Sequence, residues 1–248
     1  MLGEREVQIL TVLEDRVSNP ELIASYHDLM TPEEAARQQR FHFPKHRHQQ
    51  LLTRALCRYS LSLYTGVDPV DWRFEAGEFG KPDIVEPKGF DWLRFNLSNT
   101  DGLIACAVTR GRELGVDVEN LQRKGETVAI ADRYFSEFEA RALNALPQAQ
   151  QRDRFFRYWT LKESYIKARG MGLKLPLAQF SFHVEEKPIR ISFGPKLEDD
   201  PARWQFSQRK LSERHMLAMG VDRGSEPDLE VRIRSFVPGL PLEESAPA

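Results

Sequence analysis

The chain has 248 residues, 41% of them hydrophobic and 29% charged, which is typical of a soluble globular protein long enough to bury a core. Its formal net charge of −2 gives no bulk attraction to nucleic acid or to a membrane surface, so we expect neither as a partner. The N-terminal sequence MLGEREVQIL lacks the apolar stretch of a signal peptide, and no run approaches the roughly 18 apolar residues of a spanning helix, so we expect a cytoplasmic protein.

Helix and strand signals alternate in the first half of the sequence. A strand is expected over Glu6–Leu13, and the segment TPEE at residues 31–34 offers an N-cap, a first-turn proline and a capping-box glutamate for a short helix. A longer helix spans about Pro44–Tyr64, where apolar residues recur at helical spacing, and Gly66 ends it. Strand signals follow at Trp72–Glu75, Leu93–Leu97, Leu103–Thr109 and Leu114–Glu119. Residues 110–112, with sequence RGR, predict a hairpin turn between the last two.

The second half repeats this order. The capping box SEFE at residues 136–139 predicts a helix to about Leu146, and Arg152–Arg169 is the strongest helical pattern in the chain. Strand signals return at Phe180–Val184, Ile189–Phe193, Trp204–Ser207, Met216–Val221 and Leu229–Phe236. The proline-containing tail from Pro238 is expected to be disordered.

Helices followed by antiparallel strands, twice over, predict an α+β chain of two similar halves, split near residues 123–127. We expect an N-terminal half at 1–122, a C-terminal half at 123–237 and a tail at 238–248. This prediction depends on the order of the elements alone, because no residue-level repeat is present. The two cysteines, Cys57 and Cys106, stand in apolar sequence and are expected to be buried thiols in a reducing compartment.

The sequence GVDVEN at residues 115–120 places two carboxylates on one face of a predicted strand. Side chains alternate along a strand, so Asp117 and Glu119 point away from Val116 and Val118, with their Cα atoms about 7 Å apart. Two carboxylates at this separation repel each other, and a cation such as Mg²⁺ between them would remove the repulsion. The alternative is the solvated outer face of an edge strand.

The strongest predicted helix carries a carboxylate among aromatic side chains. With 100° per residue and Phe155 at zero, Trp159 lies at about 40°, Glu163 at about 80° and Lys167 at about 120°. A carboxylate buried beside aromatic rings is costly unless it is paired or binds a metal. The alternative is an ordinary pair of opposite charges, Glu163 and Lys167, one turn apart on a helix surface.

Three other stretches are candidates for binding anions. The turn GEFGKP at residues 77–82 presents Lys81, and backbone N–H groups of such turns can cradle a phosphate; an ordinary surface turn is the alternative. The run NLSNT at residues 96–100 ends a strand in hydrogen-bonding side chains, which can equally cap their own backbone. Basic residues gather around the first two predicted helices, at Arg37, Arg40, Lys45, Arg47 and Arg54. They form either a solvated basic face or an anion site.

Together, GVDVEN and WTLKESYIK, about forty residues apart, resemble the signature of the 4′-phosphopantetheinyl transferases, in particular the Sfp-type branch with two similar halves in one chain. Further pieces follow in the family's order: RFHFPKHRH, FGKP, FNLSNTDG and YFSEFE. The resemblance covers roughly Thr31 to Phe182. It implies two α/β halves with pseudo-two-fold symmetry, each a small, largely antiparallel sheet packed with helices.

The resemblance implies a transferase that moves the 4′-phosphopantetheine arm of coenzyme A onto a serine hydroxyl of an apo carrier protein and releases 3′,5′-ADP. Asp117, Glu119 and Glu163 match the residues that hold Mg²⁺, or Mn²⁺ in its place. Glu163 is further placed to remove the serine proton, and Lys167 matches the lysine that contacts the phosphates. The implied catalytic residues are Glu163, Lys167 and Asp117, and the last two also contact coenzyme A.

Other contacts to coenzyme A follow from the same resemblance. Arg37 matches a basic residue that holds the 3′-phosphate, and Arg47 or a neighbour matches a second basic residue. Lys81 and Pro82 match the segment that contacts adenine and phosphate.

The segment after the third predicted strand matches the family's S-H-[ST] motif with one departure. Ser98 and Thr100 fit the motif, whereas Asn99 stands at the usual histidine position. Asparagine can donate a hydrogen bond to a phosphate but carries no charge, so this contact is expected to be weaker.

Two other functions remain open. One is another Mg²⁺-dependent phosphodiesterase or phosphotransferase, against which the matched coenzyme A contacts argue. The other is a non-catalytic carrier-binding homologue, against which the intact Asp117, Glu119, Glu163 and Lys167 argue. The carrier served, whether of fatty acid, polyketide or nonribosomal peptide biosynthesis, is not identified by the sequence. Because both halves lie in one chain, a monomer is expected.

Overall fold

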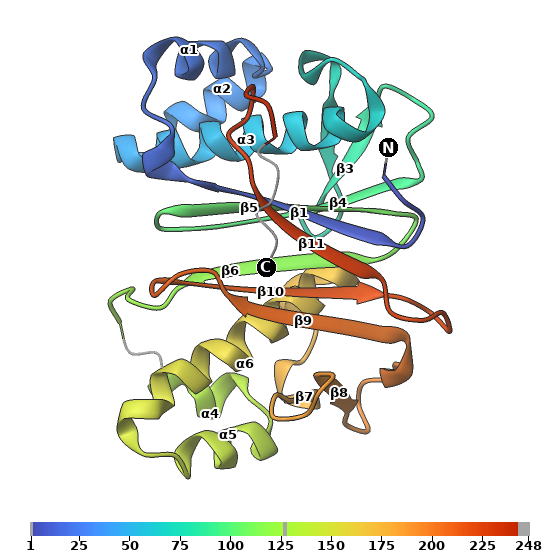
Figure 1. Cartoon of the computed structure of the whole chain (residues 1–248). Coiled ribbons are helices and arrows are strands. Elements are labelled where there is room, and N and C mark those ends of the chain that lie inside the picture. The colour runs from blue at the N-terminus through green and yellow to red at the C-terminus, as the bar shows by residue number, and fades with distance from the viewer. Residues whose placement is uncertain (1, 126–127, 243–248) are drawn as a thin grey trace. The chain divides into compact units, whose positions relative to one another are not determined.

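The structure is a computed structural model and describes residues 2–125 and 128–242. The first elements in chain order are β1 (Glu6–Leu13), α1 (Pro20–Asp28), α2 (Pro32–Gln39), α3 (Pro44–Thr65), β2 (Arg73–Ala76), β3 (Pro82–Glu86), β4 (Leu93–Thr100) and β5 (Leu103–Arg110) (Figure 1). They are followed by β6 (Leu114–Asn120), α4 (Ala131–Tyr134), α5 (Glu137–Asn144), α6 (Gln148–Arg169), β7 (Phe180–His183), β8 (Arg190–Phe193), β9 (Trp204–Lys210), β10 (His215–Asp222) and β11 (Glu230–Ser235).

The described residues form two compact units. Unit 1 takes them from Met1–Glu78, Pro82–Gly111 and Glu230–Ala248, and unit 2 from Phe79–Lys81 and Arg112–Leu229. Within the described residues, no helix is long and apolar enough to cross a membrane.

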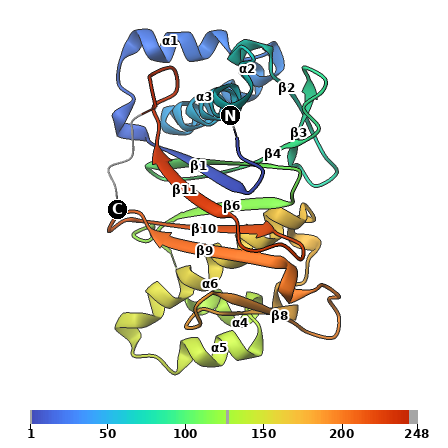
Figure 2. The same ribbon diagram turned by 45° about the vertical axis from the view of Figure 1, so that its right-hand side comes forward.

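Unit 1 is built on a four-stranded sheet in the order β11-β1-β5-β4. The 22-residue helix α3 lies across one face of this sheet, with α1 and α2 beside it (Figures 1 and 2). Leu52, Ala55 and Leu56 are buried at the helical spacing seen in the sequence, and α3 ends at Gly66 in the left-handed conformation, with φ of 75°. The predicted capping box of α2 is also formed, between Thr31 and Glu34.

Unit 2 has a three-stranded antiparallel sheet in the order β6-β10-β9, with the second 22-residue helix, α6, packed along it (Figure 1). The separate β7–β8 hairpin and α5 complete an aromatic-rich core. That core includes Phe135, Phe155, Phe156, Tyr158, Tyr165, Phe180, Phe182, Trp204 and Phe206. Strands β6 and β10, helix α5 and the β7–β8 hairpin pack against α6 and so fix its position.

The two units repeat one order of elements: a strand, short helices, a 22-residue helix, a two-stranded hairpin and an antiparallel strand pair. Their sheets also share one order of strands, β1-β5-β4 in unit 1 and β6-β10-β9 in unit 2. The α+β fold class is thereby confirmed, and both cysteines are buried free thiols as predicted. The pseudo-two-fold relation between the halves stays a prediction.

One local prediction is wrong. β5 and β6 do not form a hairpin, because β5 pairs with β1 and β4, whereas β6 pairs with β10. A tight turn between two apolar runs is a short-range signal, and it cannot show that each strand has a better partner far away in the sequence. The sheet of unit 1 is also not wholly antiparallel, since β11 pairs parallel with β1.

The compact units differ from the predicted halves at both ends of the second half. Residues 112–122 count with unit 2 because β6 pairs with β10, and residues 230–242 count with unit 1 because β11 pairs with β1. Disorder from residue 238 onwards is wrong for residues 238–242: the Tyr26 hydroxyl donates to Pro238 O at 2.6 Å, and Leu242 packs on the core of unit 1. Residues 126–127 of the expected split and residues 243–248 lie outside the described residues.

Candidate active site

Strand β6 turns one face towards α6, and this face carries Gly115, Asp117 and Glu119 at alternate positions. A Cβ atom added to Gly115 would lie 2.0 Å from Ser164 O and 2.4 Å from Ala168 N. A side chain of any size is therefore excluded at residue 115, and the helix backbone approaches the strand directly. This close approach brings the carboxylates of β6 within reach of side chains on α6.

Asp117 lies opposite Lys167 of α6. The Lys167 ammonium donates to Asp117 Oδ1 at 2.7 Å and to Val116 O at 3.2 Å. Asp117 is only 5% exposed, so the alternative of a solvated strand face is wrong. Helix and strand run past each other in opposite senses, since Gly115 meets Ala168 and the next residues of β6 meet earlier residues of α6.

Glu119 lies further along β6, beside Trp159. Burial and the charge of Asp117 raise the pKa of the Glu119 carboxyl to about 7, while Arg123, Lys167 and a hydrogen bond from Trp159 lower it. Arg123 Nε lies 3.3 Å from Glu119 Oε2. The carboxylate hydrogen-bonded to Trp159 is therefore Glu119, which comes from the strand and not from the helix.

Glu163 lies one turn before Lys167 on the face of α6 that meets β6. Burial, and after it the charge of Asp117, raise the pKa of the Glu163 carboxyl, and Lys167 opposes the shift. A simple surface pair with Lys167 does not describe this site, because the Lys167 ammonium donates to Asp117 and lies in a partly buried environment. The structure thus brings Asp117, Glu119, Glu163 and Lys167 together in unit 2.

The three carboxylates of this group, Asp117, Glu119 and Glu163, fit a divalent cation by their chemistry. Three carboxylates share one partly buried region, and Asp117 raises the pKa of both Glu119 and Glu163, so a second positive charge would relieve their repulsion. Over residues 2–125 and 128–242, however, no three acidic, histidine or cysteine side chains converge closely enough to form a finished metal site. Lys167 occupies the contact with Asp117 instead.

A buried ion pair, which the sequence analysis missed, supports α6 on its other side. Lys162 and Glu139 are both inaccessible to solvent, and their charged atoms lie 2.7 Å apart. The Lys162 ammonium also donates to Leu177 O at 2.8 Å and Phe180 O at 2.7 Å, while Glu139 accepts from the backbone N–H of Phe182 at 2.9 Å. Burial lowers the pKa of Lys162, and the contact with Glu139 opposes this shift.

The predicted anion-binding turn places its lysine on backbone carbonyls. Lys81 Nζ donates to Leu114 O and Lys167 O, each at 3.1 Å, and to Ala168 O at 3.4 Å. Pro82, the next residue, begins β3 in unit 1.

The remaining predicted contacts to coenzyme A belong to unit 1. Arg37 lies exposed on α2, and Arg47 lies in the first turn of α3, where its Nε donates to Phe41 O at 2.8 Å. Gln38 Nε2 donates to Arg47 O at 2.9 Å and so joins the two helices. At the end of β4, Ser98 is buried, Asn99 exposed and Thr100 half-buried. The relation of these residues to the carboxylates of unit 2 stays a prediction.

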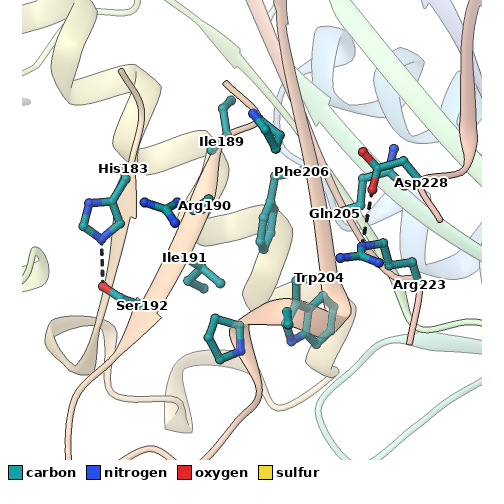
Figure 3. Close-up of a pocket in the computed structure, with 13 residues that line it drawn as sticks. His183, Ile189, Arg190, Ile191, Ser192, Trp204, Gln205, Phe206, Arg223 and Asp228 are labelled. Carbon is teal, nitrogen blue, oxygen red and sulfur yellow. Dashed lines mark hydrogen bonds and ion pairs between the residues drawn. The ribbon is translucent and has the colours of Figure 1, made fainter. Parts of the chain in front are cut away.

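A cavity of about 440 Å³ lies elsewhere in unit 2, between the β7–β8 hairpin and β9 (Figure 3). Ile191, Trp204 and Phe206 contribute apolar surface, and Arg190 and Arg223 lie at its margins. Of the described residues lining this cavity, none belongs to the predicted active site.

Parts of this chain are similar to known proteins. Residues 113–219, which contain β6 and α6, match the family model described as the 4′-phosphopantetheinyl transferase superfamily. Among solved structures, the holo-(acyl-carrier-protein) synthase of Thermotoga maritima aligns over 48% of this chain and 64% of its own, with 22% identity and a TM-score of 0.35. A likeness as low as this carries no further conclusion.

Two curated relatives are more similar. The 4′-phosphopantetheinyl transferase HetI of Nostoc sp. is 37% identical over 167 residues, which are 67% of this chain and 70% of the relative. The 4′-phosphopantetheinyl transferase Sfp of Bacillus subtilis is 32% identical over 180 residues, 73% of this chain and 78% of the relative. Identity at this level over more than two thirds of both relatives shows that the chain belongs to the 4′-phosphopantetheinyl transferases, a family of transferases.

Proposed function

We propose that this chain transfers the 4′-phosphopantetheine arm of coenzyme A to a serine hydroxyl of an apo carrier protein and releases 3′,5′-ADP. The observation that supports the proposal most is the meeting of Asp117 and Glu119 on β6 with Glu163 and Lys167 on α6. This arrangement lies in the part of the chain that matches the family model.

Asp117, Glu119 and Glu163 would hold the Mg²⁺, or Mn²⁺, on which we expect the reaction to depend. When bound, a divalent cation supplies charge neutralisation and Lewis acidity to a pyrophosphate. The raised pKa values of Glu119 and Glu163 support this assignment, because carboxyl groups that ionise with difficulty on their own gain from a cation.

Glu163 acts as the general base in this proposal. Burial raises the pKa of the Glu163 carboxyl, which makes its carboxylate a stronger base than that of an exposed glutamate. The serine oxygen forms a bond to the phosphorus that bears pantetheine, and the bond from that phosphorus to the oxygen of 3′,5′-ADP breaks. The serine proton passes to Glu163, and the departing phosphate keeps the electron pair.

Lys167 stabilises negative charge on the phosphates in this proposal. Its ammonium donates to Asp117, so it carries a fixed positive charge next to the carboxylates. A positioned cation of this kind contributes to phosphoryl transfer because it meets the charge that develops as the bond breaks.

The unit 1 residues would bind the nucleotide part of coenzyme A. We assign the 3′-phosphate to Arg37 with Arg47, and further contacts to Ser98, Asn99 and Thr100 and to the backbone at Pro82. The exposed positions of Arg37 and Asn99 are compatible with ligand contact. We further propose that the chain acts as a monomer in the cytoplasm, with a carrier protein and coenzyme A as its partners and without nucleic acid or membrane.

A phosphodiesterase using the same three carboxylates would cleave coenzyme A with water, and a non-catalytic homologue would bind a carrier without changing it. These alternatives are separated by incubating the protein with Mg²⁺, coenzyme A and a panel of apo carriers, and following 3′,5′-ADP by chromatography and the carrier by mass spectrometry. Transfer gives equal amounts of 3′,5′-ADP and modified carrier. Hydrolysis gives 3′,5′-ADP without modified carrier, and simple binding gives neither.

A further inference from the structure

The turn Phe79–Lys81 joins β2 to β3 in sequence, yet it counts with unit 2. The Lys81 ammonium donates hydrogen bonds to three carbonyl oxygens, Leu114 O, Lys167 O and Ala168 O, at Nζ–O distances of 3.1, 3.1 and 3.4 Å. An ammonium group has three N–H donors, and all three carbonyls lie within hydrogen-bond distance of it. A lysine that bound phosphate through these donors would have to give up contacts to these carbonyls.

Two of these carbonyls belong to the last turn of α6. The last four carbonyls of a helix have no partner within the helix, and the end of the helix carries partial negative charge. An ammonium group at this end supplies both hydrogen bonds and the matching charge. Lys81 therefore caps α6, and its third bond, to Leu114 O, ties this cap to the first residue of β6.

The glycine-rich exit of α6 leaves room for this cap. Gly170, with φ of 62°, ends the helix, and a Cβ atom there would lie 3.6 Å from Lys81 Cδ. Gly172 has φ of 55°, and a Cβ atom there would lie 3.7 Å from the Cβ atom of Phe79. The Lys174 ammonium lies 4.5 Å from the centre of the Phe79 ring and holds the other end of the turn. The segment 170–174 after α6 thus packs against the turn Phe79–Lys81.

The cap lies next to the proposed catalytic groups. Lys167 accepts from Lys81 through its carbonyl and donates to Asp117 through its side chain, and Leu114 precedes Gly115, where the helix backbone closely approaches the strand. We propose that Lys81 is a positioning residue for the transfer reaction: it holds the last turn of α6 against the start of β6, sets Lys167 against Asp117, and binds no phosphate of coenzyme A. This inference rests on the proposed function.

The first test compares Lys81→Met with Lys88→Met, which removes a charge from an exposed lysine beyond β3. For Lys81→Met we expect kcat per folded molecule to fall about tenfold to a hundredfold, since small misplacements of reacting groups cost this much. We expect the KM for coenzyme A, and its dependence on salt, to match those of Lys88→Met. A higher KM with a flatter salt dependence would mean that Lys81 binds phosphate, and would overturn the inference. An unchanged kcat per folded molecule would show a merely structural role and would overturn it too.

The second test replaces the hydrogen-bond donors chemically. Cys57 and Cys106 are 1% and 0% exposed, so alkylation of native Lys81→Cys can be directed to residue 81. Aminoethylation restores a lysine-like ammonium, whereas the trimethylammonium analogue restores the charge without any N–H donor. We expect the first to recover kcat and the second to leave it low; recovery by both would contradict the capping role.

A third measurement does not need turnover. Hydrogen exchange at the amides of residues 166–170 should be faster in Lys81→Met than in the parent and in Lys88→Met, because the last turn loses its cap. If the parent chain transfers nothing to any carrier, the proposed function fails, while the exchange result still decides whether Lys81 holds this turn. Equal exchange in all three proteins would overturn the capping role.

Discussion

Lys167 Nζ lies 2.7 Å from Asp117 Oδ1, and the same ammonium group donates to the Val116 carbonyl at 3.2 Å. One lysine of α6 therefore hydrogen-bonds both the backbone and a side chain of β6. The contact links the two sequence stretches from which the function was inferred, which are about forty residues apart in the chain. It also sets a positive charge among carboxylates that repel each other.

Replacing Lys167 by methionine should lower transfer by about two orders of magnitude, the usual effect of removing one group that stabilises transition-state charge. The charge of Lys167 lowers the pKa of both Glu119 and Glu163, so its loss should also raise the pKa of each. Steady-state kinetics checks the first effect, and carboxyl NMR titration checks the second. Lys210→Met is the control, because this exposed lysine pairs only with Glu213 among the contacts described for it. Equal activity of the two variants would contradict the role of Lys167.

Glu119 should make stability depend on pH when no divalent cation is present. Its pKa is raised in the folded state to about 7 from 4.5, so the folded protein binds more protons between these values and stability falls as pH rises through them. The loss relative to Glu119→Gln should reach on the order of 3 kcal/mol above pH 7. Urea unfolding from pH 4.5 to 8 in chelator measures it. Mg²⁺ should restore much of the loss, and identical pH profiles for parent and variant would contradict the assignment.

Gly115→Ala should destabilise unit 2 by about 3 kcal/mol, because its Cβ atom would lie 2.0 Å from the Ser164 carbonyl of α6. The strand and helix would have to separate, so transfer per folded molecule should fall as well. Gly3→Ala is the control, since the added atom meets only the flexible side chain of Glu6, at 2.9 Å or more. Denaturant unfolding compares the two; similar midpoints would show that the close approach of β6 to α6 is not needed.

Removing both members of the buried pair should cost less than the sum of the two single removals. Lys162→Met leaves Glu139 buried without its counter-charge and should destabilise the protein by about 3 to 5 kcal/mol. Lys162→Met combined with Glu139→Leu should be less destabilised than the sum of the single variants. A double-mutant cycle from unfolding free energies measures the coupling, and simple additivity would contradict a tight pair.

Several features of the fold could be predicted because their signals are local. The spacing of apolar residues predicts the two 22-residue helices, α3 and α6. Capping boxes in the sequence predict α2 and α5, and both capping boxes are formed in the structure. Strand pairing is not local. Nothing near residues 103–119 shows that β5 and β6 join different sheets, or that β11 returns to pair with β1. Short α1 and β3 were missed because each has a weak pattern of its own.

The carboxylates and Lys167 could be predicted as one site because strand alternation and helical spacing put each on a definable face. Their supports could not. Gly115 matters because it has no side chain, which lets α6 approach β6 closely, and this cannot be read from a pattern of side chains. Lys81 donates to backbone carbonyls, which a pattern of side chains does not show either. The position of Lys162 on the helix does point to its burial. With 100° per residue and Phe155 at zero, Lys162 lies at about 340°, on the apolar side of the helix with Phe155, where a lysine needs a buried partner.

Transfer itself is tested most directly by mass spectrometry of an apo carrier protein after incubation with the purified chain, Mg²⁺ and coenzyme A, with Glu163→Gln in parallel. We expect the parent to add the mass of one phosphopantetheine arm to a serine of at least one carrier in a panel. Glu163→Gln should keep the fold, as judged by circular dichroism, and leave the carrier unmodified. No modification of any carrier by the parent, or near-normal modification by Glu163→Gln, would contradict the proposed reaction or the role of Glu163 in it.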